Sequence, residues 1–198
     1  MDFFEKLKQF DIILASQSPR RRELLELAGI PFRVLPRPFN EHFPDNLPPH
    51  EVVMMLCGEK SRAYLAELQQ PATIVITADT IVVSQGRIIN KPSGPEEALE
   101  MLQSLSGRSH EVLTGVCIRH GELMRIFYET TRVFFRNLST AELNYYIDRY
   151  HPFDKAGAYG IQEWIGYVGI GRIEGSYPNV VGLPVERVYV ELQKLLME

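Results

Sequence analysis

Three consecutive arginines, Arg20, Arg21 and Arg22, lie in the first turn of a predicted helix. Cations at this end oppose the helix dipole, whereas the free backbone amides there attract an anion. A bound phosphate would resolve the conflict, but surface pairing with Glu23 and Glu26 would explain the arginines without a ligand. Because successive residues point in different directions around a helix, not all three arginines can reach one ligand.

Asp79 and Lys60 are charged residues placed within apolar patterns. Asp79 lies in the run from Ile74 to Val83, where a carboxylate is rarely buried without a partner. It is expected to bind a metal, act as a general base or join an ion pair, unless it lies at an exposed edge. Lys60 shares a helical stripe with Val53 and Leu56, so its side chain must either snorkel to solvent or meet an anion.

Lys91 follows a second strand of a predicted hairpin. A turn at residues 84–87 would bring residues 89–91 beside residues 78–80 if the register is regular. Lys91 is therefore expected close to Asp79, either as its ion-pair partner or as a phosphate ligand.

The segment from Asp154 to Gln162 combines small residues with one carboxamide. Glycine and alanine allow close approach of a backbone to a ligand, although a tight structural turn would explain them equally well. Gln162 offers both a donor and an acceptor, which match the imide N–H and carbonyl oxygen of thymine or uracil. Together with the cations and Asp79, this is the equipment needed to hold a triphosphate and a metal and to direct water at phosphorus.

The elements that must position these residues follow from periodicity and capping. A buried strand, Ile12 to Ala15, leads to Ser16 and to a helix that starts at Ser18–Pro19 and stops at Gly29. Further strands are predicted at 32–35, 74–83, 110–120 and 122–136, and helices at 49–68, 93–106 and 139–150 and from 184 onward. The alternation of strands and helices, with one long antiparallel hairpin, predicts a mixed α/β sheet with flanking helices. No linker divides the chain, so we expect one domain over residues 1–198, with two lobes around a central cleft as the alternative arrangement.

Composition narrows the possible partners and compartment. The net charge of -4 argues against a nucleic-acid partner, so an anion must be held by local positive charge. No apolar run is long enough to span a membrane, and the first ten residues lack the apolar core of a signal peptide. Cys57 and Cys117 lack metal or redox spacing, so we expect buried, reduced thiols and a cytoplasmic protein.

Several motifs run through the chain in a fixed order: Ile13–Leu25, Glu59–Lys60, Ala78–Thr80, Lys91–Pro92, Leu105–Arg108, Asp154–Gln162 and Gly175–Pro184. On these motifs, which span nearly the whole chain, the sequence resembles the Maf family of nucleotide pyrophosphatases. The resemblance implies hydrolysis of a nucleoside triphosphate to the monophosphate and pyrophosphate, with a divalent cation such as Mg, Mn or Co. It also implies an elongated twisted sheet similar to the inosine-triphosphate pyrophosphatase fold. The Asp154–Gln162 motif is similar to the branch that prefers dTTP and UTP.

The resemblance also assigns roles to individual residues. Asp79 is implied as the catalytic base or a metal ligand, with Glu41 as a second metal ligand. The positions implied for base preference are Arg20, Thr80 and Gln162. Those implied for phosphate binding are Ser16, Arg21, Lys60 and Lys91, which leaves Arg22 as a surface residue. Two departures from the family pattern are Asn40, where the family often has aspartate, and Glu163, where it usually has glycine.

Two other functions stay open at this point. One is a pyrophosphatase for inosine-type or methylated GTP nucleotides; the other is a non-catalytic nucleotide- or DNA-binding regulator of septum formation, a label that the family has carried. The biological purpose is either clearance of modified pyrimidine nucleotides or restraint of cell division. The aromatic residues of the long hairpin serve core packing or, alternatively, a homodimer interface, and core packing is favoured: Phe127, Tyr128, Phe134 and Phe135.

Overall fold

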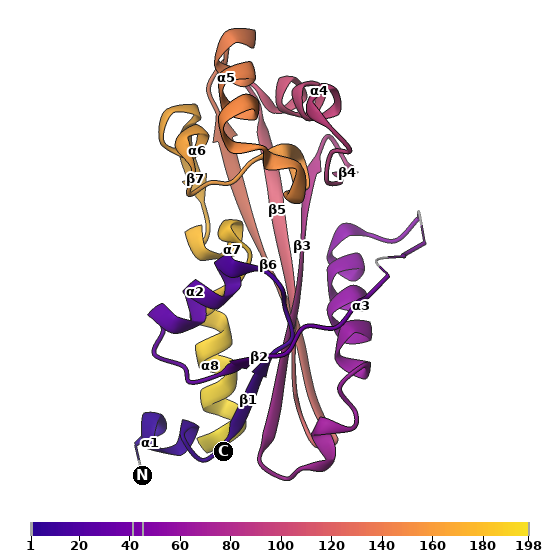
Figure 1. Ribbon diagram of the computed structural model, residues 1–198, viewed down its shortest axis with the longest axis vertical. Helices are drawn as coiled ribbons and strands as arrows, with labels where there is room; N and C mark the ends of the chain where they lie inside the picture. Colours follow the sequence, from indigo (N-terminus) through magenta and orange to yellow (C-terminus); the bar gives the residue numbers. More distant parts are fainter. Residues whose placement is uncertain (1, 41, 45, 198) are drawn as a thin grey trace. The chain divides into compact units, whose positions relative to one another are not determined.

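The computed structural model describes residues 2–40, 42–44 and 46–197. The chain forms two compact units (Figure 1). The first unit comprises Met1–Asp79, Thr114–Glu129 and Gly182–Glu198, and the second comprises Thr80–Leu113 and Thr130–Val181. Three strands, β3 (Thr73–Ser84), β5 (Ser109–His120) and β6 (Leu123–Phe135), contribute residues to both units.

The strands form a seven-stranded sheet in the order β2-β1-β3-β5-β6-β7, with β4 paired to β3. The remaining strands are β1 (Asp11–Leu14), β2 (Arg33–Val34), β4 (Arg87–Ile89) and β7 (Ile170–Glu174). β1 pairs in parallel with β2 and β3, whereas β4 and β7 pair antiparallel with β3 and β6. The predicted mixed α/β sheet with flanking helices is therefore confirmed.

The helices are α1 (Phe3–Leu7), α2 (Pro19–Leu27), α3 (Pro49–Arg62), α4 (Pro95–Leu105), α5 (Thr140–Tyr150), α6 (Trp164–Gly169), α7 (Tyr177–Val181) and α8 (Val185–Met197). Three 3₁₀ turns are η1 (Glu67–Gln69), η2 (Pro152–Asp154) and η3 (Ala156–Ala158). Among the described residues, none of these helices combines the length and apolar character needed to cross a bilayer.

In the first unit, helices cover both faces of the strands (Figure 1). Side chains alternate along a strand, so Ile12 and Leu14 of β1 face one core, with Leu25 of α2 and Leu192 of α8. Ile13 points the other way, into a smaller cluster on the side of α3. This strand therefore carries a continuous apolar run because both of its faces are buried.

The second unit has a core of its own. Leu102 of α4, Tyr146 of α5 and Val133 of β6 belong to one buried cluster. Ser139 starts α5 with a capping box, as its Ser-x-x-Glu spacing predicts. This cap satisfies backbone amides that the helix itself leaves unpaired.

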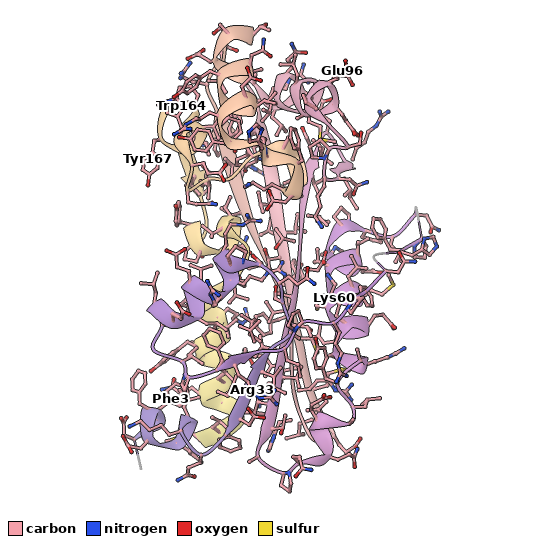
Figure 2. All side chains as sticks on the ribbon, in the orientation of Figure 1. Phe3, Arg33, Lys60, Glu96, Trp164 and Tyr167 are labelled. Carbon is pink, nitrogen blue, oxygen red and sulfur yellow. The ribbon has the colours of Figure 1, made fainter. Side chains whose placement is uncertain are left out.

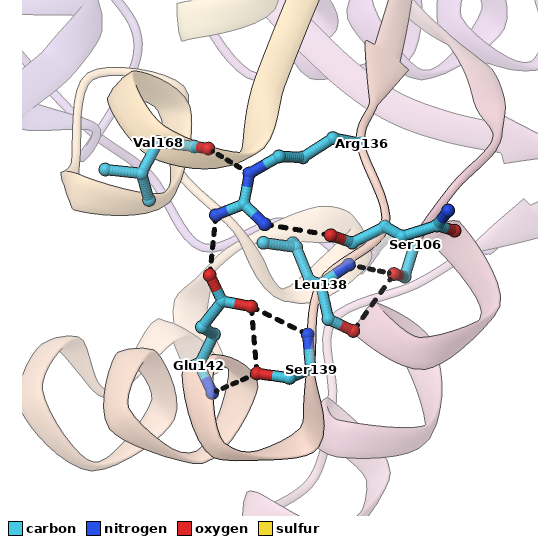
Figure 3. A network of polar contacts seen from close by, with 7 residues as sticks. Ser106, Arg136, Leu138, Ser139, Glu142 and Val168 are labelled. Atoms are coloured by element: carbon cyan, nitrogen blue, oxygen red, sulfur yellow. Dashed lines mark hydrogen bonds and ion pairs between the residues drawn. The ribbon is translucent and has the colours of Figure 1, made fainter.

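Figure 3 shows a network of polar contacts around Ser106 and the start of α5. The Ser106 hydroxyl accepts a 2.7 Å hydrogen bond from the backbone N–H of Leu138. Arg136 donates from Nε to the Val168 carbonyl at 2.6 Å and from Nη2 to Glu142 at 2.6 Å. The bond from Arg136 lowers the pKa of Glu142 to about 2. The network ties the start of α5 to its neighbours, so Ser106 has a structural role.

Two regions differ from the sequence prediction. α3 ends at Arg62 rather than near residue 68. Tyr64 lies just beyond the helix, where its hydroxyl donates to the Leu35 carbonyl at 2.6 Å. The glycine-rich stretch before Gly182 contains α6, β7 and α7, none of which was predicted. α7 is anchored by tertiary contacts, since Asn179 Nδ2 donates at 3.0 Å both to the Val112 carbonyl and to Thr131 Oγ1.

The first helix, α1, packs on the body of its unit, with the Phe3 ring 4.8 Å from that of Tyr189. Two smaller predictions are confirmed. Cys57 and Cys117 are buried free thiols. In the long hairpin, Phe127 and Phe135 are buried, which confirms core packing for these two; Tyr128 is exposed, and Phe134 lies under the guanidinium of Arg172.

His110 gives the second unit a predictable dependence on pH. Its ring contacts Phe135 and Tyr159, and its Nε2 lies 2.7 Å from the Tyr159 hydroxyl. Burial lowers the pKa of His110 to about 4. An unfolded histidine has a pKa of about 6.5, so the unfolded state binds the extra proton first as pH falls, and stability is lost from about pH 6.5 down to about pH 4.

We therefore expect His110→Phe to weaken this dependence. Between pH 7 and pH 5 the wild type should lose roughly 2 kcal/mol of unfolding free energy from this residue, and the variant should not. Urea unfolding at both pH values measures the difference, and only the change with pH is compared because the variant also loses a hydrogen bond. His42→Phe, at an exposed loop position, is the control and should keep the wild-type dependence. Equal pH dependence in wild type and His110→Phe would contradict the assignment.

Candidate active site

The loop that follows β1 is shaped by two serines. Ser18 is the N-cap of α2, and its hydroxyl accepts from the backbone N–H of Arg21 at 3.4 Å. Ser16 is buried, and its hydroxyl accepts from the backbone N–H of Ser18 at 3.2 Å. The predicted strand, loop and capped helix are thus confirmed, with Arg20, Arg21 and Arg22 in the first turn.

Arg21 holds three segments of the first unit together. Its Nε donates to the Gly182 carbonyl at 2.8 Å, and its Nη1 donates to the Ala78 carbonyl at 2.9 Å and to Ser16 Oγ at 3.3 Å. These bonds fix Ser16 beside the backbone that leads directly into Asp79. The sequence did not indicate them, because the two carbonyls lie 161 and 57 residues away.

The other two arginines of this turn have different surroundings. Arg22 is exposed and lies 3.8 Å from Glu26, as expected for a surface pair. Arg20 is half-buried. The phosphate and base-preference roles assigned to Arg21 and Arg20 stay predictions.

Alternation along β3 places Asp79 on the side of α3. Val75 packs in the cluster on this face, and Thr77 Oγ1 donates to the Cys57 carbonyl at 2.6 Å. Asp79, two residues farther on, accepts from Lys60 Nζ. Asp79 is therefore a buried carboxylate in an ion pair, with a side chain that is 8% exposed.

Lys60 reaches Asp79 because of its place on α3. Cys57 and Lys60 are three residues apart on α3 and so lie on one helix face, and Figure 2 shows Lys60 directed from α3 toward the strands. Close packing of this helix requires Gly115 of β5, where a Cβ would lie 2.4 Å from the Val53 carbonyl oxygen. Lys60 thus meets an anion rather than snorkelling, and that anion is Asp79.

The residues implied as ligands of a divalent cation are Asp79 and Glu41. Within residues 2–40, 42–44 and 46–197, no three histidine, cysteine, aspartate or glutamate side chains converge on one point. Glu41, the second implied ligand, lies outside the described residues. Asp79 supplies a hard oxygen donor, which fits Mg²⁺, because this ion is usually held by one or two carboxylates together with substrate phosphates and water.

Three further predicted residues, Thr80, Lys91 and Gln162, lie in the second unit. The predicted hairpin forms, with Ser84 opposite Arg87, but Ile89 lies opposite Val82 rather than beside residues 78–80 as predicted. Beyond it, the Asn90 carbonyl accepts from the backbone N–H of Gly157 at 3.1 Å. The segment that carries Lys91 therefore lies against the small-residue segment that leads to Gln162.

The residue after Gln162, Glu163, has its carboxylate held inside the second unit. The Tyr146 hydroxyl donates to Glu163 Oε2, and Lys155 Nζ lies 3.1 Å from Glu163 Oε1. Burial, together with the bond to Glu163, raises the pKa of the Tyr146 hydroxyl, which therefore stays protonated and donates. The carboxylate added at position 163 is thus paired with Lys155, which also pairs with Asp154 at 2.7 Å. The sequence did not reveal this partnership, because Tyr146 appears only as a core residue of a helix.

Gln162 has an unusual polar environment. Its Oε1 is buried and has no hydrogen-bond donor among the residues that the structure describes. Leaving a buried acceptor unpaired costs about 1–3 kcal/mol. A ligand that brings an N–H donor to this oxygen would remove the cost.

One structural comparison gives a distant likeness. The solved structure described as the Staphylococcus aureus Ham1 protein shares 15% sequence identity with this chain, with a TM-score of 0.42 over 63% of this chain and 71% of that one. At this level the likeness does not establish a common fold.

The sequence comparisons are much stronger. A protein of Cytophaga hutchinsonii named dTTP/UTP pyrophosphatase is 50% identical over 193 residues, which cover 98% of this chain and 88% of that protein. A protein of Porphyromonas gingivalis with the same name is 49% identical over 96% of both chains. The family described as Maf-like protein matches residues 11–195. The chain belongs to the Maf family.

Proposed function

We propose that this chain is a nucleoside triphosphate pyrophosphatase that hydrolyses dTTP and UTP to the monophosphate and pyrophosphate. One observation carries the proposal: in the first unit, the loop that follows β1 lies next to the backbone of the buried Lys60–Asp79 pair. Arg21 makes this link, since it binds both Ser16 and the carbonyl that precedes Asp79. Relatives that are nearly half identical over almost the full chain carry the name of this activity.

The chemistry follows from these groups. Water attacks in line, the bond between the α and β phosphates breaks, and pyrophosphate leaves. Asp79 either accepts a proton from the attacking water or ligates the metal. Lys60, Ser16 and Arg21 bind phosphate oxygens, and Lys60 neutralises charge that develops in the transition state. A divalent cation held by Asp79 and Glu41 would supply Lewis-acid stabilisation of the phosphates. Lys91 is proposed as a further phosphate ligand.

Gln162 supports a pyrimidine substrate with an imide group. Thymine and uracil carry an N–H at N3, which the unsatisfied Gln162 Oε1 can accept. Cytosine presents an acceptor at the same position, so it would face this oxygen without a proton between them. Arg20 and Thr80 are proposed to contribute to base preference as well. The two buried free cysteines and the nucleotide substrate support a cytoplasmic location.

A panel of triphosphates tests the proposed function. We expect UTP and dTTP to release pyrophosphate at least about tenfold faster than CTP, ITP or methylated GTP, because a site built to hydrogen-bond one group rejects analogues without it. Chelation with EDTA should abolish release, and Mg²⁺ or Mn²⁺ should restore it. A preference for ITP or methylated GTP would establish the purine alternative, and nucleotide binding without any pyrophosphate release would establish the non-catalytic one.

Asp79→Asn tests the role of the buried carboxylate. Asparagine keeps an oxygen for Lys60 but cannot accept a proton, so turnover of UTP should fall by about 10²–10⁴-fold. Circular dichroism and thermal unfolding establish whether the variant is folded. The matched control is Asp11→Asn, which removes an exposed carboxylate paired with Arg33 at 2.7 Å and should leave turnover unchanged. Near-normal turnover in folded Asp79→Asn would reject the mechanism.

A further inference from the structure

We propose that Glu163 is a positioning residue whose carboxylate decides which end of the Gln162 carboxamide faces a bound base, and so sets the preference for uracil and thymine over cytosine. The inference rests on the proposed function and deepens it. It concerns side chains that all lie in the second unit.

The need for such a residue follows from the symmetry of a carboxamide. Its oxygen and its nitrogen are nearly equal in size, so a half-turn exchanges an acceptor for a donor at little steric cost. In one orientation Gln162 suits uracil, with Oε1 toward the N3 proton. In the other it suits cytosine, with Nε2 toward the unprotonated N3 and Oε1 toward the exocyclic amine. A freely turning Gln162 would accept both bases, and discrimination requires that its surroundings fix one orientation.

The surroundings of Gln162 are charged on one side. A Cβ on Gly160 would lie 3.0 Å from Gln162 Nε2 and 3.0 Å from Glu163 Oε2, so both side chains cover the same face of this glycine. The negative carboxylate on that side favours the amide nitrogen there over the amide oxygen. Oε1 is then directed elsewhere, in agreement with its lack of a donor among the described residues.

The carboxylate itself is held rigidly. The Tyr146 hydroxyl accepts from the backbone N–H of Gly160 at 3.0 Å, so its own proton is available for Glu163 Oε2. Lys155 holds the other carboxylate oxygen at 3.1 Å. Tyr146 is fully buried and Lys155 is 8% exposed, so these contacts are protected from solvent. Glu163 and Gly160 are thus fixed by the same tyrosine.

Glu163→Gln removes the charge with little change in shape. If the new amide nitrogen faces Lys155, two donors oppose each other; if it faces Tyr146, the tyrosine proton loses its acceptor. In the first case an uncharged amide oxygen remains near Gln162, which weakens the preference for Nε2 there, and in the second case a donor takes its place, which reverses the preference. The variant should therefore gain activity on CTP relative to UTP, rather than lose activity on both equally.

The test is a cycle of variants measured with UTP and CTP. We expect Glu163→Gln to lower the ratio of kcat/KM for UTP to that for CTP about tenfold, as expected for the loss of one oriented hydrogen-bonding group. Gln162→Ala should lower the ratio at least as far, and the double variant should match Gln162→Ala alone. Tyr146→Phe is the second variant and should shift the ratio in the same direction. The ¹⁵N signal of the Gln162 side-chain amide should move in Glu163→Gln without substrate present.

Leu143→Ala is the matched control. Leu143 lies on α5 with Tyr146 and is buried in the same core, so its truncation lowers stability without touching the network. It should lower the melting temperature and leave the UTP-to-CTP ratio and the Gln162 signal unchanged.

Three results separate the possible failures. An unchanged ratio and amide signal in folded Glu163→Gln and Tyr146→Phe would overturn the inference alone. Additive effects of Glu163→Gln and Gln162→Ala would also overturn it, because Glu163 would then act independently of Gln162. A wild-type protein that does not hydrolyse UTP would overturn the proposed function and the inference with it.

Discussion

The first unit is organised around one buried ion pair, between Lys60 and Asp79. Two opposite charges that are both largely removed from water must stay together, since separating such a pair leaves an uncompensated charge at a cost of about 3–5 kcal/mol. α3 is therefore bound to β3 by more than apolar packing. Thr77 and Gly115 support the same contact between helix and sheet. The Thr77 hydroxyl donates to the backbone of α3, and Gly115 has no side chain that would keep the helix away.

Arg21 extends this arrangement to the loop after β1. Its guanidinium is aimed at backbone carbonyls and Ser16, so the segments that hold Asp79, Ser16 and Gly182 keep a fixed geometry. A cation at the start of a helix, which the helix dipole disfavours, is thus partly compensated by carbonyl dipoles before any phosphate arrives. Pre-organised donors of this kind need little rearrangement when charge develops on a substrate.

The second unit contains a different charged pair, which is largely buried. This pair, Lys155 and Glu163, is linked through Tyr146 to the backbone of Gly160. Other family motifs in this unit are structural: Ser106 supports the connection to α5 (Figure 3), and Asn179 anchors α7.

Local sequence patterns were enough to predict most of the helices and strands and to single out two unusual charged residues. Periodicity and capping predicted the buried strand at β1, the helix capped by Ser18, the β3–β4 hairpin and the capping box of α5, because these signals depend on neighbouring residues. The sequence also identified Asp79 and Lys60 as charges within apolar patterns.

The partners of these residues became known only from the folded structure. It paired Asp79 with Lys60, gave Arg21 two distant carbonyls and enclosed Glu163 between Tyr146 and Lys155. It also formed α6, β7 and α7, which are too short for local signals and depend on contacts such as those of Asn179. Sequence patterns show which groups need a partner, but the partner is set by contacts between residues far apart in the chain.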